Sequence, residues 1–350
     1  MENADVRPTG PTLPTGRGDL SYGVVRALRG RPGSGTPLPA RTAADDAAPY
    51  GEDLHLALYL CYELHYRGFC GVDPAWEWDP ALLAFRATLE RHFLDALRAD
   101  TKRRADVDEA LADLLVEPPD GTSVSHYLRD EGELWHLREY AAQRSVQHLK
   151  EADPYAWVIP RLRGRAKAAM AAVEFAEFGA GHAGRSRSRL YADLMTDLGL
   201  DAAYGRYVEV TTGEMLASVN LMSMFGLHRA LRGALVGHRA AVEAVSVPAA
   251  RRLAEAMRGA GAGGAAVRFY GAYAPDDTPS GEGTHDPAGH LTADPALVRR
   301  EVVGGLLDDE PWLETDVAFG VDATGVLDAR LAERLLTAWR DGLSGLRSSR

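Results

Sequence analysis

The stretch DLHLALYLCYELHY, residues 53–66, decides the fold class of this chain. Between Leu54 and Leu64 only His55 and Glu63 are strongly polar. A helix over these residues is apolar on nearly every side, which is typical of a helix that lies inside a protein rather than on its surface. The stretch therefore predicts a central helix surrounded by other helices.

The rest of the chain carries the same helical periodicity. Apolar residues recur at spacings of three and four in residues 81–100, 155–178 and 325–345. Period-two alternation between turn signals, the mark of a half-buried strand, is not found. We expect an all-α fold.

The first 46 residues differ in composition from the remainder. They are rich in Pro, Gly, Arg and Thr, as in RPTGPTLPTGRG and RGRPGSGTPLPARTA. Such a composition buries too little apolar surface to offset the entropy lost on ordering. The prediction is a disordered N-terminal tail over residues 1–46 and one helical domain over residues 47–350.

Charge and composition exclude several classes of protein. The formal net charge of −11 argues against nucleic-acid or membrane partners, which require clustered positive charge. Two cysteines, Cys61 and Cys70, are too few for a disulfide framework or a zinc cluster. The chain has no apolar run of about 18 residues and no apolar core of a signal peptide near its start, so we expect a cytoplasmic protein.

Three glutamates are candidates for chemistry because each sits in an apolar helical neighbourhood. Glu63 points in the direction of Leu56 and Tyr59, and an unpaired carboxylate there would cost several kcal/mol. Glu177 ends an apparent helix, and Glu243 lies in the apolar stretch GALVGHRAAVEAVSV. A metal, a proton or a salt bridge to one of the 36 arginines would each satisfy Glu63, while Glu177 could also be exposed near its helix end.

Three long stretches carry a resemblance to a known family. Residues 56–80, 149–181 and 220–243 closely resemble the haem-oxygenase-like iron-containing redox enzymes, and the resemblance covers most of residues 50–345. It implies a haem-oxygenase-like helical bundle with a non-haem di-metal site. Active members use such a site to activate dioxygen and to oxidise or oxygenate a small molecule, often in specialised metabolism.

The metal ligands of the family can be transferred to this chain only in part. The resemblance puts Glu63, Glu177 and Glu243 at its three glutamate positions and expects them to meet in one cavity. Arg187 stands where the family has its first histidine, and a guanidinium offers no lone pair to a metal. We expect Arg187 to turn inward and pair with a carboxylate in place of the missing charge; His182 is an alternative substitute for the lost ligand.

The last motif of the family, His-x-x-x-Asp-x-x-His, has two registers in this chain. The local pattern HLTADPAL places its first two positions at His290 and Asp294, where Asp294 also fits as the N-cap of a following helix. Alignment from Phe269 places them instead at Tyr273 and Asp277. The final histidine is absent in both registers.

Two functions remain open on the sequence alone. In the first, the protein is an oxidase or oxygenase that uses non-haem iron, at full or reduced occupancy, with dioxygen and a small-molecule substrate. In the second, the iron is lost, the metal site is degenerate, and the protein is a catalytically silent relative that binds a small-molecule ligand or a partner in the old cavity. A homodimer is compatible with either function.

Overall fold

The computed structural model describes residues 10–116, 123–271 and 295–346, and every regular element in these ranges is helical. The expected all-α, haem-oxygenase-like class is therefore confirmed for this part of the chain. The α-helices are α1 (Asp19–Leu28), α2 (Arg41–Asp45), α3 (Glu52–Glu63), α4 (Pro80–Asp100), α5 (Val107–Leu114), α6 (Val124–Asp130), α7 (Leu134–His148), α8 (Ala152–Ala156), α9 (Gly164–Glu177), α10 (Arg187–Asp197), α11 (Gly213–Leu227), α12 (Arg232–Gly259), α13 (Gly264–Gly271), α14 (Pro295–Leu297), α15 (Gly304–Asp309) and α16 (Glu314–Arg340). Short 3-10 turns and one π-helical segment, Val298–Val303, connect them.

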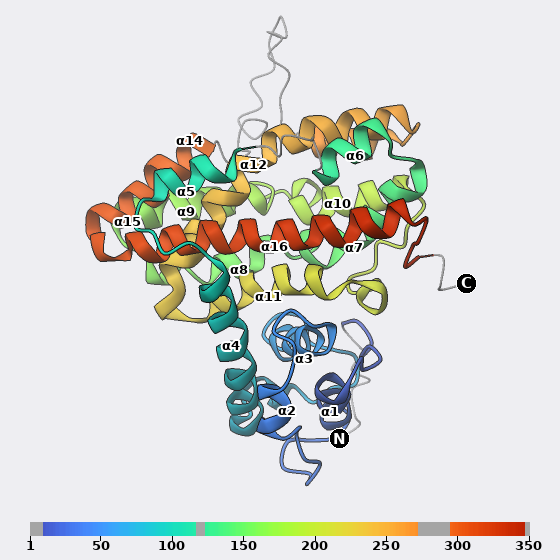
Figure 1. Cartoon of the computed structure of the whole chain (residues 1–350), viewed down its shortest axis with the longest axis vertical. Helices are drawn as coiled ribbons and strands as arrows, with labels where there is room; N and C mark the ends of the chain where they lie inside the picture. The colour runs from blue at the N-terminus through green and yellow to red at the C-terminus, as the bar shows by residue number, and fades with distance from the viewer. Residues whose placement is uncertain (1–9, 117–122, 272–294, 347–350) are drawn as a thin grey trace, which may run out of the picture.

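The two longest helices, α12 and α16, pack closely against each other across the upper part of the molecule (Figure 1). A Cβ atom added at Gly237 would overlap the backbone of Val317, and one added at Gly320 would overlap the backbone of Ala234. These two glycines let the backbones of the two helices come into direct contact. The close packing fixes the direction in which the polar residues of α12 point.

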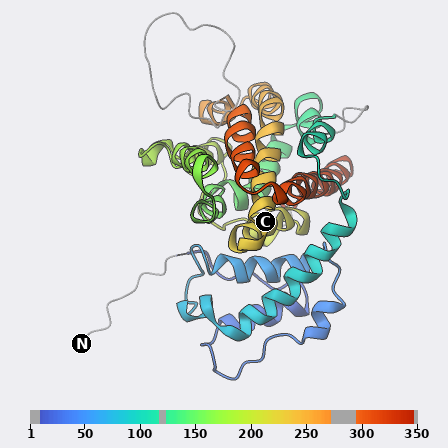
Figure 2. The same ribbon diagram turned by 90° about the vertical axis from the view of Figure 1, so that its left-hand side faces the viewer.

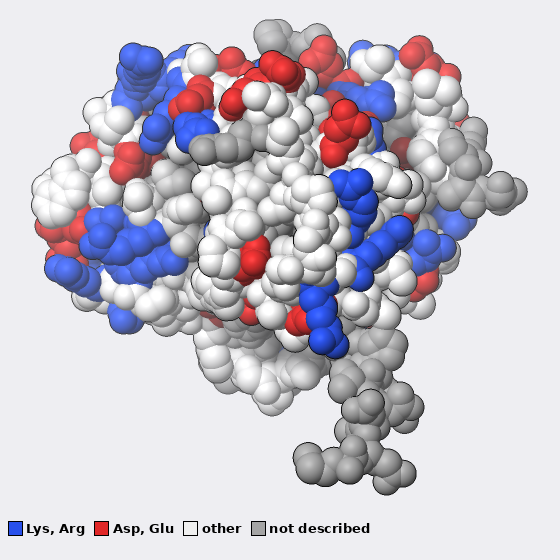
Figure 3. Space-filling view, turned by 90° about the horizontal axis from the view of Figure 1, so that it is seen from below, with Lys and Arg blue, Asp and Glu red and all other residues white. Residues whose placement is uncertain are grey.

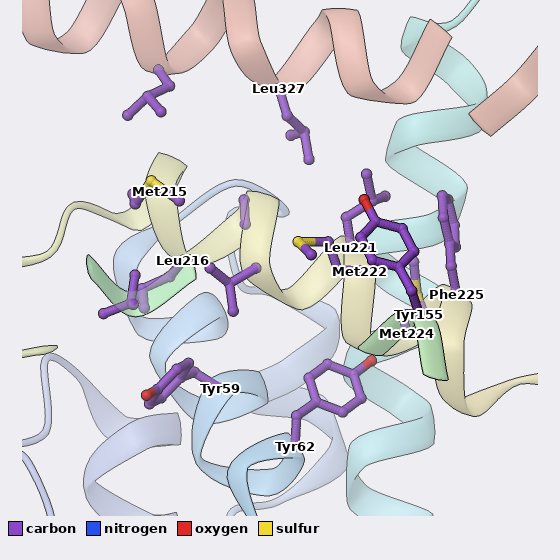
Figure 4. Packing of buried hydrophobic residues seen from close by; sticks show 14 of the residues in the cluster. Tyr59, Tyr62, Tyr155, Met215, Leu216, Leu221, Met222, Met224, Phe225 and Leu327 are labelled. Carbon is purple, nitrogen blue, oxygen red and sulfur yellow. The ribbon is translucent and has the colours of Figure 1, made fainter. Parts of the chain in front are cut away.

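Helix α11 lies between α16 and α3 and is buried along nearly its whole length. Tyr62 of α3 points toward α11 from one side, and Leu327 of α16 points toward it from the other (Figure 4). Helix α3 is buried from Leu54 to Glu63. The apolar stretch over residues 53–66 thus forms the central helix that its composition predicts, although the helix ends at Glu63.

The N-terminal region differs from the expected disordered tail. Helix α1 packs on α3, and Leu20, Val24 and Leu28 are 2%, 0% and 0% exposed (Figure 2). The backbone amides of Leu20 and Ser21 donate hydrogen bonds to the carboxylate of Asp53 at 3.0 and 2.8 Å. Apolar residues at a spacing of four give α1 a face that α3 buries, which the Pro- and Gly-rich flanks hide in the average composition. Residues 1–9 of the expected tail lie outside the described residues.

The surface around α1–α4 is mixed in charge. Viewed from below, acidic and basic side chains are interspersed among uncharged ones (Figure 3). Across the ranges that the structure describes, no helix combines the length and the apolar character that crossing a membrane requires.

Candidate functional site

Glu177 and Glu243 meet at one guanidinium, that of Arg239. Glu177 is the last residue of α9, and Glu243 lies one turn after Arg239 on α12. Arg239 Nη2 donates to Glu177 Oε1 at 2.9 Å and forms an ion pair with Glu243 Oε1 as well. All three side chains are at most 6% exposed. A single fixed positive charge therefore holds two buried carboxylates together.

Arg187 supplies a second positive charge at the same place. It is the first residue of α10, its side chain is 10% exposed, and its Nε lies 3.5 Å from Glu177 Oε2. Its guanidinium also lies over the ring of Phe269, 5.8 Å from the centroid. Arg187 therefore turns inward toward Glu177 as expected. His182, the alternative substitute, is exposed in the loop before α10 and does not take that place.

Glu63 is satisfied by a different pair of groups. It is fully buried, Lys150 Nζ donates to its Oε2 at 2.7 Å, and Tyr204 Oη donates to its Oε1 at 2.7 Å. The Lys150 ammonium also lies over the ring of Tyr66 at 4.4 Å and the ring of Tyr59 at 5.0 Å. The salt-bridge interpretation expected an arginine here, and the partner is instead one of only three lysines in the chain.

The three glutamates expected in one cavity thus belong to two ion-pair groups, Glu63 to one and Glu177 and Glu243 to the other. Lys150 and Glu151 connect them along the chain, since Lys150 binds Glu63 and Glu151 lies within the field of Arg187 and Arg239. Burial alone would raise the pKa of Glu151, but His148 and the two arginines hold it at about 2. Glu151 is therefore an ionised member of the Arg239 group.

Glu174 is the member of this group with no partner. It lies one turn before Glu177 on α9 and is 2% exposed, and within the described residues neither carboxylate oxygen accepts a hydrogen bond. Burial raises its pKa to about 8, against the opposing effect of Arg239, and the negative charges of Glu177 and Glu151 raise it further. Glu174 is thus neutral at pH 7. Burial likewise raises the pKa of Glu243, to about 7, although Arg239 opposes the shift.

A pocket that is partly open to solvent lies beside the Arg239 group. It is bounded by α7, α11, α12, α13 and α16 and includes Glu151 and its partner His148 in its wall. The His148 Nδ1 to Glu151 Oε2 distance is 2.7 Å. The apolar part of the wall is formed by Leu221, Met222, Val242, Leu253, Phe269 and Leu327. An ion-paired acid cluster and a mainly apolar pocket therefore share one wall.

The segment that contains this arrangement has known relatives. Residues 138–274 match the iron-containing redox enzyme family. The match confirms the resemblance over this segment and supports a general redox enzyme function for it. No curated protein matches the chain.

The family segment contains one of the two ion-pair groups in full. Glu177, Arg187, Arg239 and Glu243 all lie within residues 138–274, whereas Glu63 lies before them. The sequence also predicts metal ligands in the last motif of the family. These candidates lie outside the described residues: His290 and Asp294, and Asp277 in the alternative register. Their role as ligands stays a prediction.

The described residues do not fit the iron for which the family is named. Within the ranges that the structure describes, no three His, Cys, Asp or Glu side chains are grouped so as to hold a metal ion. The candidate glutamates instead bind Arg239, Arg187 and Lys150. Two of these, Arg239 and Lys150, are not singled out by the sequence analysis. Only the spacing of four between Arg239 and Glu243 signals a pair in advance.

Proposed function

We propose that this chain binds a small organic molecule in the cavity beside Glu151, and that arginines rather than iron balance the acid cluster. The observation that carries the proposal is the double ion pair of Arg239 with Glu177 and Glu243. A guanidinium is a permanent cation without a lone pair for a metal. Carboxylate oxygens engaged by it are not open to a second cation without breaking a buried pair, which costs roughly 3–5 kcal/mol.

The charge of the cluster supports the same proposal. Arg187 and Arg239 oppose the carboxylates of Glu151, Glu177 and Glu243, while Glu174 stays neutral because burial raises its pKa to about 8. Carboxylates without a cation would repel one another, and a divalent metal is the usual remedy. With two guanidiniums already in place, a metal would add positive charge that the described acids do not require.

In the proposed function the residues of the cluster act as structure. Arg239 ties the end of α9 to α12, and Arg187 ties the start of α10 to the same carboxylate. Together they hold Glu151 and His148 in place on the cavity wall. The ligand then binds against an apolar surface beside the closed contact of His148 and Glu151.

Iron-dependent oxidation of a small molecule is the second candidate, favoured by the family match over residues 138–274. In it, iron would be bound by the carboxylates with ligands from the motif at His290 and Asp294, and Arg239 would have to leave Glu177 and Glu243. Both candidates take a small molecule, as a ligand in the first and as a substrate in the second. Dioxygen is a co-substrate only in the iron-dependent oxidation.

Metal content separates the two candidates. The chain is produced in iron-supplemented cells, its metals are measured by mass spectrometry, and ferrous iron is then titrated into it without oxygen. We expect well under one iron per chain and no saturable uptake. Stoichiometric binding of two irons would overturn the proposal and favour the oxidase or oxygenase.

Variants at the two arginines make the test sharper. Arg187→His alone should not restore iron loading, because Arg239 still occupies Glu177 and Glu243. The double variant Arg187→His/Arg239→Leu should bind more ferrous iron than the unmodified chain, since it frees two carboxylates and adds an imidazole. Arg232→Leu, which removes another buried arginine of α12 paired with Glu310, is the matched control and should leave metal uptake unchanged.

A further inference from the structure

Arg144 of α7 and Asp328 of α16 face each other on the wall of the cavity without making a hydrogen bond. The distance from Arg144 Nη2 to Asp328 Oδ1 is 3.7 Å, and the two side chains are 20% and 40% exposed. This separation exceeds that of a direct hydrogen bond, so the two groups form a loose ion pair.

Both groups retain unused hydrogen-bonding capacity. Arg144 has five N–H donors: Nη1 donates to Gln147 Oε1 at 3.0 Å and the Tyr140 side chain is a second partner, while the buried Nε has no hydrogen-bond partner among the described residues. The carboxylate of Asp328 accepts no hydrogen bond from any described residue, although it can accept several. The cavity wall thus offers a donor and an acceptor side by side.

The remainder of the wall disfavours a charged ligand. The other charged pair, His148 and Glu151, is closed at 2.7 Å, and the surface between is apolar, with Leu327 pointing toward Leu221 and Met222 (Figure 4). A net charge bound here would be desolvated against apolar groups and would satisfy only one of Arg144 and Asp328. A neutral group that both donates and accepts satisfies both.

We infer that the cavity takes a largely apolar molecule whose single polar group is a donor and an acceptor at once, with a carboxamide as the best match. Its carbonyl oxygen accepts from Arg144, and its N–H donates to Asp328. This inference rests on the proposed small-molecule function of the same cavity and adds the chemical class of the ligand.

Four probes with one apolar body test the class of the polar group: 4-phenylbutanamide, 4-phenylbutanoate, 4-phenylbutylamine and butylbenzene. Each is titrated into the full chain by calorimetry at pH 7. We expect the amide to bind about tenfold more tightly than the other three, because each of them leaves a hydrogen-bonding position of Arg144, Asp328 or both unfilled. Equal binding of all four, preference for the acid or the amine, or no binding of the amide would each overturn the inference.

Variants then test whether the two named residues recognise the amide. Asp328→Ala and Arg144→Met should each weaken the amide by about tenfold and change the binding of butylbenzene little. Glu333→Ala, on the exposed face of the same helix α16, is the control and should bind the amide as the unmodified chain does. Thermal unfolding of each variant checks that it is folded. If Arg144→Met does not fold, Asp328→Ala alone is used to test the inference. Unchanged amide binding in Asp328→Ala would overturn the inference.

The two proposals fail in different ways. If the chain binds two irons and the amide still depends on Asp328, the metal-free function is wrong and the ligand class stands. If the chain is free of iron and the amide does not bind, the ligand class is wrong and the metal-free cluster stands.

Discussion

Arg239 Nη2 lies 2.9 Å from Glu177 Oε1, and this contact joins the end of α9 to the first third of α12 across 62 positions of sequence. The same nitrogen also pairs with Glu243. An ion pair this deeply buried adds little net stability when complete, but the loss of one partner leaves a charge stranded. The free energy of unfolding should therefore fall strongly when one member of the cluster is replaced, and weakly when a charged residue is replaced together with its partners.

Arg239→Leu is the most direct test of the cluster. It should lower the free energy of unfolding by roughly 3–5 kcal/mol, since Glu177 and Glu243 lose their shared cation. Urea unfolding at pH 7 measures the change. The triple variant with Glu177→Gln and Glu243→Gln should recover much of the loss; an equally large loss in the triple variant would mean that packing, not charge, is responsible.

Arg187→Ala should cost less than the loss of Arg239. From the sequence alone, as the sole partner of a buried acid, Arg187 would be expected to contribute roughly 3–5 kcal/mol. Glu177 keeps its 2.9 Å contact with Arg239, however, so we expect a loss of roughly 1–3 kcal/mol, the range of one hydrogen bond to a charged group. A loss as large as that of Arg239→Leu would show that Arg187 is the principal cation of the cluster.

Lys150 and Glu63 should behave as a coupled pair. Lys150→Met leaves a fully buried carboxylate without its cation and should lower the free energy of unfolding by roughly 3–5 kcal/mol. Glu63→Gln in the same chain should reduce that loss. The coupling energy from the double-mutant cycle is the measurement, and a value near zero would contradict the pairing.

Glu174 should make the fold less stable as the pH rises. Its folded-state pKa is raised to about 8, whereas in the unfolded chain a glutamate titrates near ~4.3. Between these values the folded state holds a proton that the unfolded state has lost, so stability falls with rising pH, by roughly 3–5 kcal/mol in all. Glu174→Gln should reduce this slope, leaving the part that comes from the raised pKa of Glu243, and should unfold at higher urea than the unmodified chain at pH 8, with little difference at pH 5. The control Glu255→Gln, an exposed site on α12, should retain the slope.

Much of the fold can be predicted from the sequence because helical periodicity is a local property. The apolar residues of 53–66 and 325–345 recur at helical spacing, and α3 and α16 form there. The burial of Glu63 follows from the same spacing. The periodicity of α1 was also present, in Leu20, Val24 and Leu28, but the composition around it masked the signal.

The sequence by itself determined the helical class, the family of residues 138–274, and the candidate acids Glu63, Glu177 and Glu243. Only the tertiary structure decided which cation each acid binds. Glu63 and Lys150 are 87 positions apart, and Arg239 reaches Glu177 because Gly237 and Gly320 let α12 and α16 pack closely and fix the orientation of α12. The pairing of buried charges depends on distances between helices, which are set by packing and leave no periodic trace in the chain.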